Sequence, residues 1–501
     1  MAGGALPLHA RIVAGLVTQP ASTVVWFRQD LRVADNPALS FAAAHGPVIP
    51  LYVLDETPAP GGRPLGAASR WWLHGSLERL ATSLGGLLLL RGEAAQLVPE
   101  VVRRTGARRV VWNRCYEPYA VERDQALKAR LTATGVQALS FNGSLLFEPW
   151  EIRTGEGGPF RVYSPFWRAC MKRNVPAPPE RPAVRPSTAN FAGDSLSSWG
   201  LRPVAPDWAA GFAQAWSPGE AGAQRQLREF LSTGLNGYAE FRDHPQLPHV
   251  SRLSPHLHFG ELSPRQVWSA TRALLARRPA LLPDADKFLA ELGWREFAAH
   301  LLYHFPNLPT CNWRQAFDTY PWAENPAHLR AWQKGETGYP LVDAGMRELW
   351  RTGYMHNRVR MIAASFLVKH LRLHWREGES WFWDTLVDAD LANNVAGWQW
   401  VAGSGADAAP YFRIFNPIEQ GRRFDPAGAY VRKWCPEIAA LGNAHIHAPF
   451  AAPAQVLRTA GIVLGRTYPA PLVDHAQART EALAGYRLVQ ERSRGKRGAP
   501  A

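Results

Sequence analysis

The chain has 501 residues, which corresponds to about three domains of average size. Its hydrophobic content of 46% excludes disorder for most of the chain, and no apolar run approaches the roughly 18 residues that a membrane span needs. Lysine and arginine together number 56 against 42 acidic residues, and the net charge of +14 indicates either a polyanionic partner or the arginine bias of a GC-rich genome.

The cysteines indicate the compartment in which the protein works. Cys115, Cys170, Cys311 and Cys435 are scattered, without a CxxC pair or a Cys/His spacing typical of metal ligands. This pattern predicts neither a disulfide scaffold nor a metal site. A reducing cytoplasm is therefore the expected location.

The N-terminal part of the chain alternates short apolar runs with helical patterns. Residues 1–22 are expected to form a disordered extension, and residues 23–150 a Rossmann-like α/β domain whose parallel sheet is covered on both faces. The expected strands lie at 23–27, 47–54, 87–90, 108–113 and 136–141, with helical patterns at 70–83 and 119–132. The turn after the first strand reads FRQDLRVADNP instead of GxGxxG, which disfavours an ordinary NAD site.

The remaining chain shows no strand pattern beyond about residue 223. Residues 151–222 are expected to form an interdomain linker lying over the surface, because residues 174–222 within it are rich in Pro, Ala and Ser. Residues 223–485 carry apolar residues at three- and four-residue spacing, which predicts an all-α domain. Residues 486–501 form a basic tail that is expected to be disordered.

The segment DKFLAELGWREF places three unusual side chains on one helical face. Glu291, Trp294 and Arg295 fall at positions i, i+3 and i+4. An acid, a large aromatic and a guanidinium on one face can hold a heteroaromatic ligand. The alternative is an ordinary amphipathic helix with a Glu–Arg surface pair.

Two further segments have the composition of a polar ligand site. In YMHNRVRM, Asn357, Arg360 and Met361 share a helical face, whereas Arg358 points elsewhere. DADLANNVAGWQW combines acids, amides and tryptophans, which is too polar for a core helix and suits a polar ligand edge near aromatic faces.

The segment HVSRLSPHLHFGELSPRQ has the features of a phosphate-binding turn. Ser251, Arg252 and Ser254 precede a helical pattern, so hydroxyls, a cation and free backbone N–H groups meet there. Ordinary N-capping by serine is the alternative. Each motif alone has such an alternative, but their joint presence indicates a ligand site.

At this point the residues resemble the photolyase/cryptochrome family of flavoproteins. The resemblance runs from VVWFRQDLRVADNPAL to RRFDPAGAYVRKWCPEI, and includes TGYPLVDAGMRELWRTGYMHNRVRM and DADLANNVAGWQWVAGSGADAAPYFRIFNP. Within the family the chain looks most like the cyclobutane pyrimidine dimer DNA photolyases. The resemblance implies an α/β antenna domain followed by an all-α domain that binds FAD, used as FADH⁻.

The resemblance also implies which positions contact FAD. Arg360 and Asp388 match an ion pair beside the flavin ring, and Asp390 matches an acid at the ring edge or ribityl chain. Asn394 matches a neutral amide that faces flavin N5 and follows its protonation. The implied cofactor positions are Tyr238, Ser251, Arg252, Leu253, Ser254, Arg295, Arg360, Asp388, Asp390 and Asn394.

On the substrate side, the implied partner is DNA that contains pyrimidine dimers. Glu291, in its protonated form, and Asn357 would donate hydrogen bonds to the carbonyls of a dimer flipped out of the duplex. The apolar walls of the dimer pocket would be Trp294, Met361 and Trp400. Arg242, Arg295, Arg358 and Arg413 match basic positions that would bind DNA phosphates.

The implied reaction is light-driven: excited FADH⁻ passes an electron to the dimer, the cyclobutane ring splits, and the electron returns. Trp398, Trp375 and Trp322 match a tryptophan chain that photoreduces oxidised FAD. Trp381 and Trp383 add aromatics for an alternative electron branch. Core packing is the alternative for any single tryptophan. The expected catalytic group is Glu291, Asn357, Asn394, Trp398, Trp375 and Trp322.

Other members of the family remain as alternatives. A (6-4) photolyase would carry histidines at positions 357 and 361, where this chain has Asn and Met. A cryptochrome-type blue-light photoreceptor usually loses part of the dimer pocket and often gains a long C-terminal extension. The antenna chromophore stays open between a folate, a deazaflavin and none. A monomer without membrane association is expected.

Overall fold

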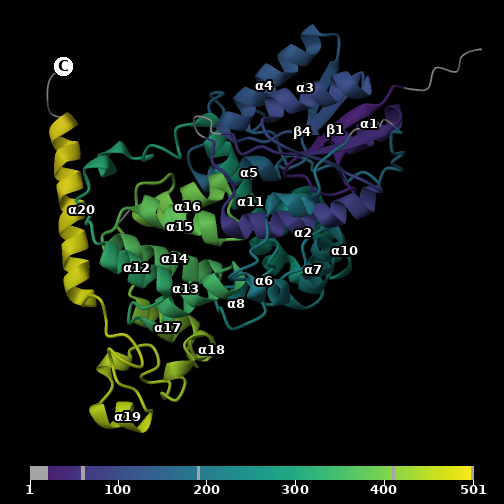
Figure 1. Cartoon of the computed structure of the whole chain (residues 1–501). Helices are drawn as coiled ribbons and strands as arrows, with labels where there is room; N and C mark the ends of the chain where they lie inside the picture. Colours follow the sequence, from purple (N-terminus) through teal and green to yellow (C-terminus); the bar gives the residue numbers. More distant parts are fainter. Residues whose placement is uncertain (1–20, 58–61, 189–191, 409–411, 498–501) are drawn as a thin grey trace, which may run out of the picture.

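The computed structural model describes residues 21–57, 62–188, 192–408 and 412–497, so the expectation for residues 1–22 falls almost entirely outside the described residues. Two domains are visible in Figure 1, a small α/β domain and a larger helical domain. In the described residues no helix is both long and apolar enough to cross a membrane.

A five-stranded parallel sheet forms the centre of the α/β domain, in the order β3-β2-β1-β4-β5. The strands are β1 (Thr23–Phe27), β2 (Val48–Leu54), β3 (Leu88–Arg91), β4 (Arg109–Asn113) and β5 (Gln137–Phe141). Their apolar and β-branched residues suit strands buried on both faces. The predicted strands agree with these bounds to within one residue at each end, and the predicted α/β class is confirmed.

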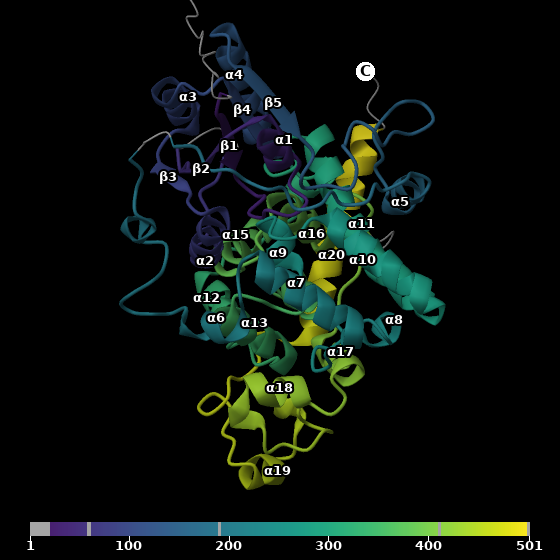
Figure 2. The same ribbon diagram turned by 90° about the vertical axis from the view of Figure 1, so that its right-hand side faces the viewer.

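Helices cover both faces of the sheet (Figure 2). Val25 and Phe27 of β1 pack toward α1 (Pro37–His45) and α2 (Ala67–Leu84), whereas Val24 and Trp26 pack on the opposite face, toward α3 (Ala94–Thr105) and α4 (Pro118–Ala133). This division follows from the two-residue period of a strand. The sequence patterns predicted α2 and α4 but did not single out α1 or α3.

The second domain consists of helices joined by loops, with no strand in its described residues, as predicted, and its largest hydrophobic core gathers α13, α14 and α16. Its elements are α7 (Glu220–Glu229), α8 (Tyr238–Phe241), α9 (Ser254–His258), α10 (Pro264–Arg277), α11 (Leu282–His304), α12 (Pro326–Lys334), α13 (Pro340–Thr352), α14 (Asn357–Ser365), α15 (Trp375–Thr385), α16 (Leu391–Ala402), α17 (Pro417–Phe424), α18 (Ala429–Trp434), α19 (Ala454–Thr459) and α20 (His475–Arg497). Short π-helical turns at Phe230–Gly234 and Phe366–His370 extend α7 and α14.

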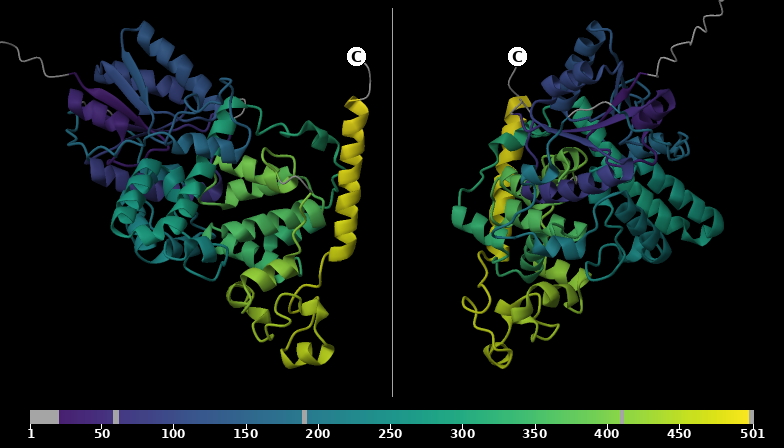
Figure 3. Two further views of the ribbon diagram at one scale, coloured as in Figure 1. Left: turned by 180° about the vertical axis from the view of Figure 1, so that it is seen from behind. Right: turned by 45° about the vertical axis from the view of Figure 1, so that its right-hand side comes forward.

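Two expectations about the connecting and terminal segments need correction. Segment 151–222 is not a bare connection, because it carries α5 (Tyr163–Met171) and α6 (Ala210–Ala215). The apolar residues of α5 at helical spacing pack on α11, and the helix ends just before the Pro-rich residues 174–222. The tail is not disordered after residue 485, since α20 continues as one helix to Arg497 along one side of the molecule (Figure 3).

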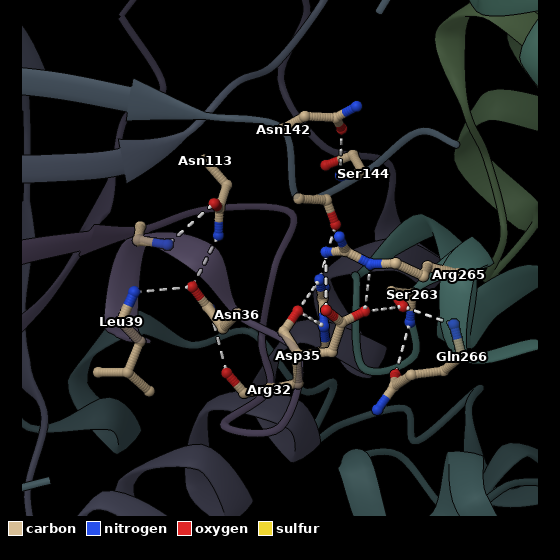
Figure 4. A network of polar contacts seen from close by, with 12 residues as sticks. Arg32, Asp35, Asn36, Leu39, Asn113, Asn142, Ser144, Ser263, Arg265 and Gln266 are labelled. Atoms are coloured by element: carbon tan, nitrogen blue, oxygen red, sulfur yellow. Dashed lines mark hydrogen bonds and ion pairs between the residues drawn. The ribbon is translucent and has the colours of Figure 1, made fainter. Parts of the chain in front are cut away.

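The α/β domain is fixed to the helical domain by a buried polar network (Figure 4). Arg32 is fully buried and donates to the carbonyl oxygens of Asp35, Gly143 and Gly260. Asp35 forms an ion pair of 2.7 Å with Arg265 at the start of α10. Gly260 has a φ of +64°, and a Cβ there would lie 2.1 Å from the Gln29 carbonyl oxygen. The two domains therefore meet through residues with no room for rearrangement.

Candidate active site

A cavity of about 840 Å³ opens into the helical domain between α8, α9, α11, α14 and α16. It brings together every predicted cofactor residue, most of the predicted dimer and phosphate residues, and one tryptophan of the predicted chain. The predicted residues that line it are Tyr238, Arg242, Ser251, Arg252, Leu253, Ser254, Glu291, Trp294, Arg295, Asn357, Arg358, Arg360, Met361, Asp388, Asp390, Asn394, Trp398 and Trp400. The cavity does not reach Arg413, Trp375 or Trp322.

The loop before α9 has the conformation of an anion-binding turn. Arg252 has a φ of +52°, and its guanidinium lies over the rings of Trp216, at 4.1 Å, and Tyr354, at 5.3 Å. Its Nε is buried, and the described residues provide no acceptor for it. Ser254 donates to Asp388 Oδ2 at 2.5 Å, so in this structure its hydroxyl is occupied by a side chain. The unpartnered donor fits a phosphate group.

An ion pair crosses the floor of the cavity, as the resemblance implied. Arg360 donates from both Nη atoms to Asp388, at 2.8 and 3.1 Å, and from Nε to the Met355 carbonyl oxygen at 2.6 Å. Burial alone would lower the pKa of Arg360, but Asp388 outweighs it and raises that pKa above its ordinary value. Arg360 therefore stays charged beside any ligand in the cavity.

Asp390 begins α16 and caps it, because its Oδ1 accepts from the Asn393 backbone N at 2.9 Å. Burial alone would raise the pKa of Asp390, but the His258 ring, whose Nδ1 lies 3.6 Å from Oδ2, and the charge of Arg295 hold it well below its ordinary value. Arg295 itself donates to the Ser144 carbonyl oxygen at 2.7 Å. Asp390 is thus an ionised acceptor for hydroxyl or N–H groups of a ligand.

Asn394 lies one turn further along α16, and its orientation is set by a residue that the sequence patterns missed. Its Nδ2 donates to the Glu379 backbone carbonyl at 3.0 Å and to Glu379 Oε1 at 2.8 Å. Glu379 is buried and also pairs with Arg63, from the segment between β2 and α2. No local pattern identifies these two residues, because Arg63 lies 316 positions before Glu379.

On the other side of the cavity, two of the predicted phosphate-binding arginines hold carboxylates. Arg242 donates to Glu291, and Arg358 donates to Asp243. Glu291 accepts from Arg242 here, so donation by a protonated Glu291 to a bound ligand requires that this contact be broken. Arg413 is exposed outside the cavity, over the Phe415 ring.

The predicted apolar walls lie near these pairs. Trp294 stacks on Tyr163 with ring centroids 3.7 Å apart, and 37% of its surface is exposed. Trp400 donates from Nε1 to the Asp407 carbonyl oxygen at 3.1 Å. Asn357 is exposed at the start of α14, one turn before Met361 on the same face. An aromatic ligand could therefore enter from solvent.

The predicted tryptophan chain follows packed elements outward from the cavity. Trp398 is buried against α15, where a Cβ on Gly378 would lie 2.0 Å from its ring. Trp375 begins α15 and is fully buried, and His374 lies between it and Trp322, at ring distances of 5.7 and 5.0 Å. Trp322 is half-buried. Ring contacts therefore connect Trp375 to Trp322 through His374, and the step from Trp398 to Trp375 stays a prediction.

The tryptophans of the alternative branch lie on the same helix but contact other partners. Trp381 stacks on the exposed Trp350, at 6.0 Å. Trp383 donates to the Pro64 carbonyl oxygen at 2.9 Å, and the Arg63 guanidinium lies 4.8 Å from its ring.

Comparison with known proteins gives the family. The family model of the FAD binding domain of DNA photolyase matches residues 288–488, and the DNA photolyase model matches residues 23–183. A deoxyribodipyrimidine photo-lyase of Agrobacterium fabrum is 50% identical and covers 94% of this chain and 98% of its own length. Cryptochrome-2 of Arabidopsis thaliana is 40% identical, over 91% of this chain and 77% of its own.

The fold agrees with a solved structure of the same kind. The crystal structure of a bacterial class III photolyase from Agrobacterium tumefaciens matches with a TM-score of 0.92 and 49% identity, over 96% of this chain and 100% of that chain. The predicted resemblance and the two-domain fold are both confirmed by these matches. The chain belongs to the DNA photolyase/cryptochrome family and contains its FAD-binding domain.

Proposed function

We propose that this protein is a deoxyribodipyrimidine photo-lyase that repairs cyclobutane pyrimidine dimers in DNA by light-driven electron transfer. One observation carries the proposal: a single cavity joins a buried floor of charged and amide groups to an open wall of aromatic and hydrogen-bonding groups. The 50% identity to a protein named as such a photo-lyase supports the same activity.

FAD is the cofactor that fits the floor of the cavity. Arg252 offers an unpartnered donor for a phosphate, and Asp390 an ionised acceptor for hydroxyl or ring N–H groups. Asn394 offers an amide oxygen, and the Arg360–Asp388 pair a fixed pair of charges. When bound and reduced, FAD supplies the electron that light makes available to the dimer.

The protein residues at the open wall receive the damaged bases. Trp294, Trp400 and Met361 provide apolar surface for the pyrimidine rings, and Asn357 an amide for their carbonyls. Arg242 already holds Glu291, so DNA phosphates and this carboxylate compete for its guanidinium. Binding of DNA would release Glu291 toward the bases.

Three properties accompany this proposal. Electrons reach an oxidised cofactor through Trp322, Trp375 and Trp398, and the Trp381/Trp383 branch remains a second route. A second, light-harvesting chromophore bound to the α/β domain remains open between a folate, a deazaflavin and none. A monomer located in the cytoplasm stays a prediction.

The test uses the flavin-loaded, chemically reduced protein with DNA that contains thymine dimers, with and without blue or near-UV light. Repair only in the light is expected. Repair in the dark, or no repair in the light although reduced flavin is bound, would contradict the proposal. The second outcome would favour a cryptochrome-type photoreceptor, the candidate that the 40% identity to Cryptochrome-2 supports.

The Trp322→Phe variant tests the electron path separately. Photoreduction of oxidised FAD should fall to a small fraction of the wild-type rate, because phenylalanine is much harder to oxidise than tryptophan. Repair by the chemically reduced variant should be unchanged. Trp332→Phe is the matched control, because the buried Trp332 ring contacts Trp398 but is not part of the proposed path. If both variants photoreduce equally well, the proposed path is wrong.

A further inference from the structure

The amide of Asn394 is held in one orientation by two acceptors on one residue. The backbone carbonyl and Oε1 of Glu379 lie 3.0 and 2.8 Å from the same Asn394 nitrogen. Only the NH₂ end of an amide can satisfy two acceptors, so the carbonyl end must point away from Glu379. Asn394 also lines the cavity, which leaves its Oδ1 to a ligand.

A carbonyl oxygen at this place discriminates between the protonated and the unprotonated form of the ligand atom that it faces. It accepts a hydrogen bond from an N–H group, and it repels a ring nitrogen that carries only a lone pair. With the amide reversed, the preference would also reverse. The orientation set by Glu379 therefore favours a ligand that is protonated opposite Asn394.

The position of Glu379 in turn depends on the other domain. Arg63 Nη1 donates to both carboxylate oxygens of Glu379, at 2.7 and 2.8 Å, and Nη2 donates to Ser380 Oγ at 2.9 Å. The Glu379 side chain is 8% exposed, so water cannot replace Arg63 as its main partner. The guanidinium also stacks 4.8 Å from the Trp383 ring, which fixes its plane.

We propose that Arg63, in the α/β domain, is a positioning residue for the flavin site: through Glu379 it fixes the Asn394 amide so that the bound flavin is held in its reduced, N–H-bearing form. The inference rests on FAD binding as proposed above. It assigns to the α/β domain a direct part in the redox equilibrium of a cofactor held by the helical domain.

The test measures the redox equilibrium of the flavin, which does not depend on repair. The ratio of reduced to oxidised flavin in Arg63→Met is determined by spectroelectrochemistry at the midpoint potential of the wild-type protein. A fall of about tenfold is expected, equivalent to about 30 mV for a two-electron couple. Arg63→Lys, which keeps the charge, should recover most of the ratio.

Two comparisons separate positioning from general damage. Arg70→Met removes another guanidinium of the α/β domain, one that pairs with Glu56, and should leave the ratio unchanged. In a Glu379→Leu background the Arg63→Met change should have less than a third of its effect, because its route to Asn394 is gone. An equal effect in both backgrounds would overturn the proposal.

The remaining outcomes distinguish a failure of this inference from a failure of the proposed function. An unchanged ratio in Arg63→Met with FAD bound overturns the inference and leaves the proposed function intact. If Arg63→Met does not retain FAD, the ratio of reduced to oxidised flavin is measured in Arg63→Gln instead. This variant keeps N–H donors for Glu379, and its ratio is examined for the same fall. Loss of flavin from both would assign Arg63 to cofactor retention and reject its role in the redox equilibrium. Failure of the wild-type protein to bind FAD would reject the proposed function itself.

Discussion

The two walls of the cavity use ion pairs in different ways. The inner wall, defined here by Arg360, Asp388, Asp390 and Asn394, holds its charges in buried contacts with several partners each. The outer wall, defined by Arg242, Glu291, Trp294, Asn357 and Arg358, differs in the exposure of its paired carboxylate, because the Glu291 side chain is 31% exposed against 3% for Asp388. The inner wall is built before a ligand arrives, whereas the outer wall can exchange its partners for those of a ligand.

The largest effect is expected from breaking the inner wall. Arg360→Met leaves the Asp388 carboxylate buried without a cationic partner, which costs about 3 kcal/mol or more. The variant should unfold at lower denaturant concentration and be purified with little flavin, measured by its absorbance near 450 nm. Arg422→Met, at an exposed pair with Glu419, is the control and should do neither. Normal flavin content in Arg360→Met would show that the inner wall is not built around this pair.

The next effect concerns the outer wall. Glu291→Ala removes a group that meets the substrate without disturbing the buried contacts. The quantum yield of repair should fall by roughly tenfold, the effect of losing one hydrogen bond that protonated Glu291, once released by Arg242, donates to a carbonyl of the dimer. Flavin content should stay at the wild-type value. If the variant instead loses flavin, the outer wall also contributes to flavin binding, and the two walls do not have separate roles.

A smaller effect is expected in the salt dependence of DNA binding. If Arg358 leaves Asp243 for a DNA phosphate, Arg358→Ala should reduce the slope of log K against log salt by about 0.9. The slope is measured by fluorescence anisotropy with dimer-containing duplex. Arg458→Ala, on α19 at the opposite end of the molecule in Figure 1 from α11 and α16, which line the cavity, should leave the slope unchanged. Equal slopes for wild type and Arg358→Ala would mean that its ion pair persists in the complex.

The smallest effect tests the charge of Asp390 by pH. Because the folded state lowers the pKa of Asp390, its charge stabilises the protein above the ordinary value of 3.8, and this stabilisation disappears as pH falls below it. Asp390→Asn should therefore be less stable than wild type at pH 7, by about 1 kcal/mol. The difference should shrink in denaturant titrations toward pH 3. A constant difference across this range would contradict the charge argument.

Elements marked by a clear pattern in neighbouring residues were predicted from the sequence, and elements without such a pattern were missed. The strands of the α/β domain were found to within a residue because a short, continuous apolar run between turn residues is typical of a buried strand. Helix α5, with the buried Tyr163, Phe166 and Cys170, was missed because it directly precedes the Pro-rich residues 174–222 and was included with them in one predicted linker. Its amphipathic spacing was the one signal that could have identified it.

The site shows the same limit. The cavity residues were found through motifs, but the partners that orient them were not. Nothing near Glu291 indicates that Arg242 will hold it, and nothing in the segment around Arg63 indicates Glu379. These contacts join distant parts of the chain, so only the folded arrangement reveals them.

The buried network between the domains has an optical consequence. Buried contacts of Arg32, Asp35 and Arg265 hold the α/β domain against the helical domain in one orientation (Figure 4). Resonance energy transfer depends on the angle between two transition dipoles as well as on their distance. A chromophore carried by the α/β domain would therefore keep a constant angle to one in the cavity, and the efficiency of transfer between them would be a fixed property of the fold.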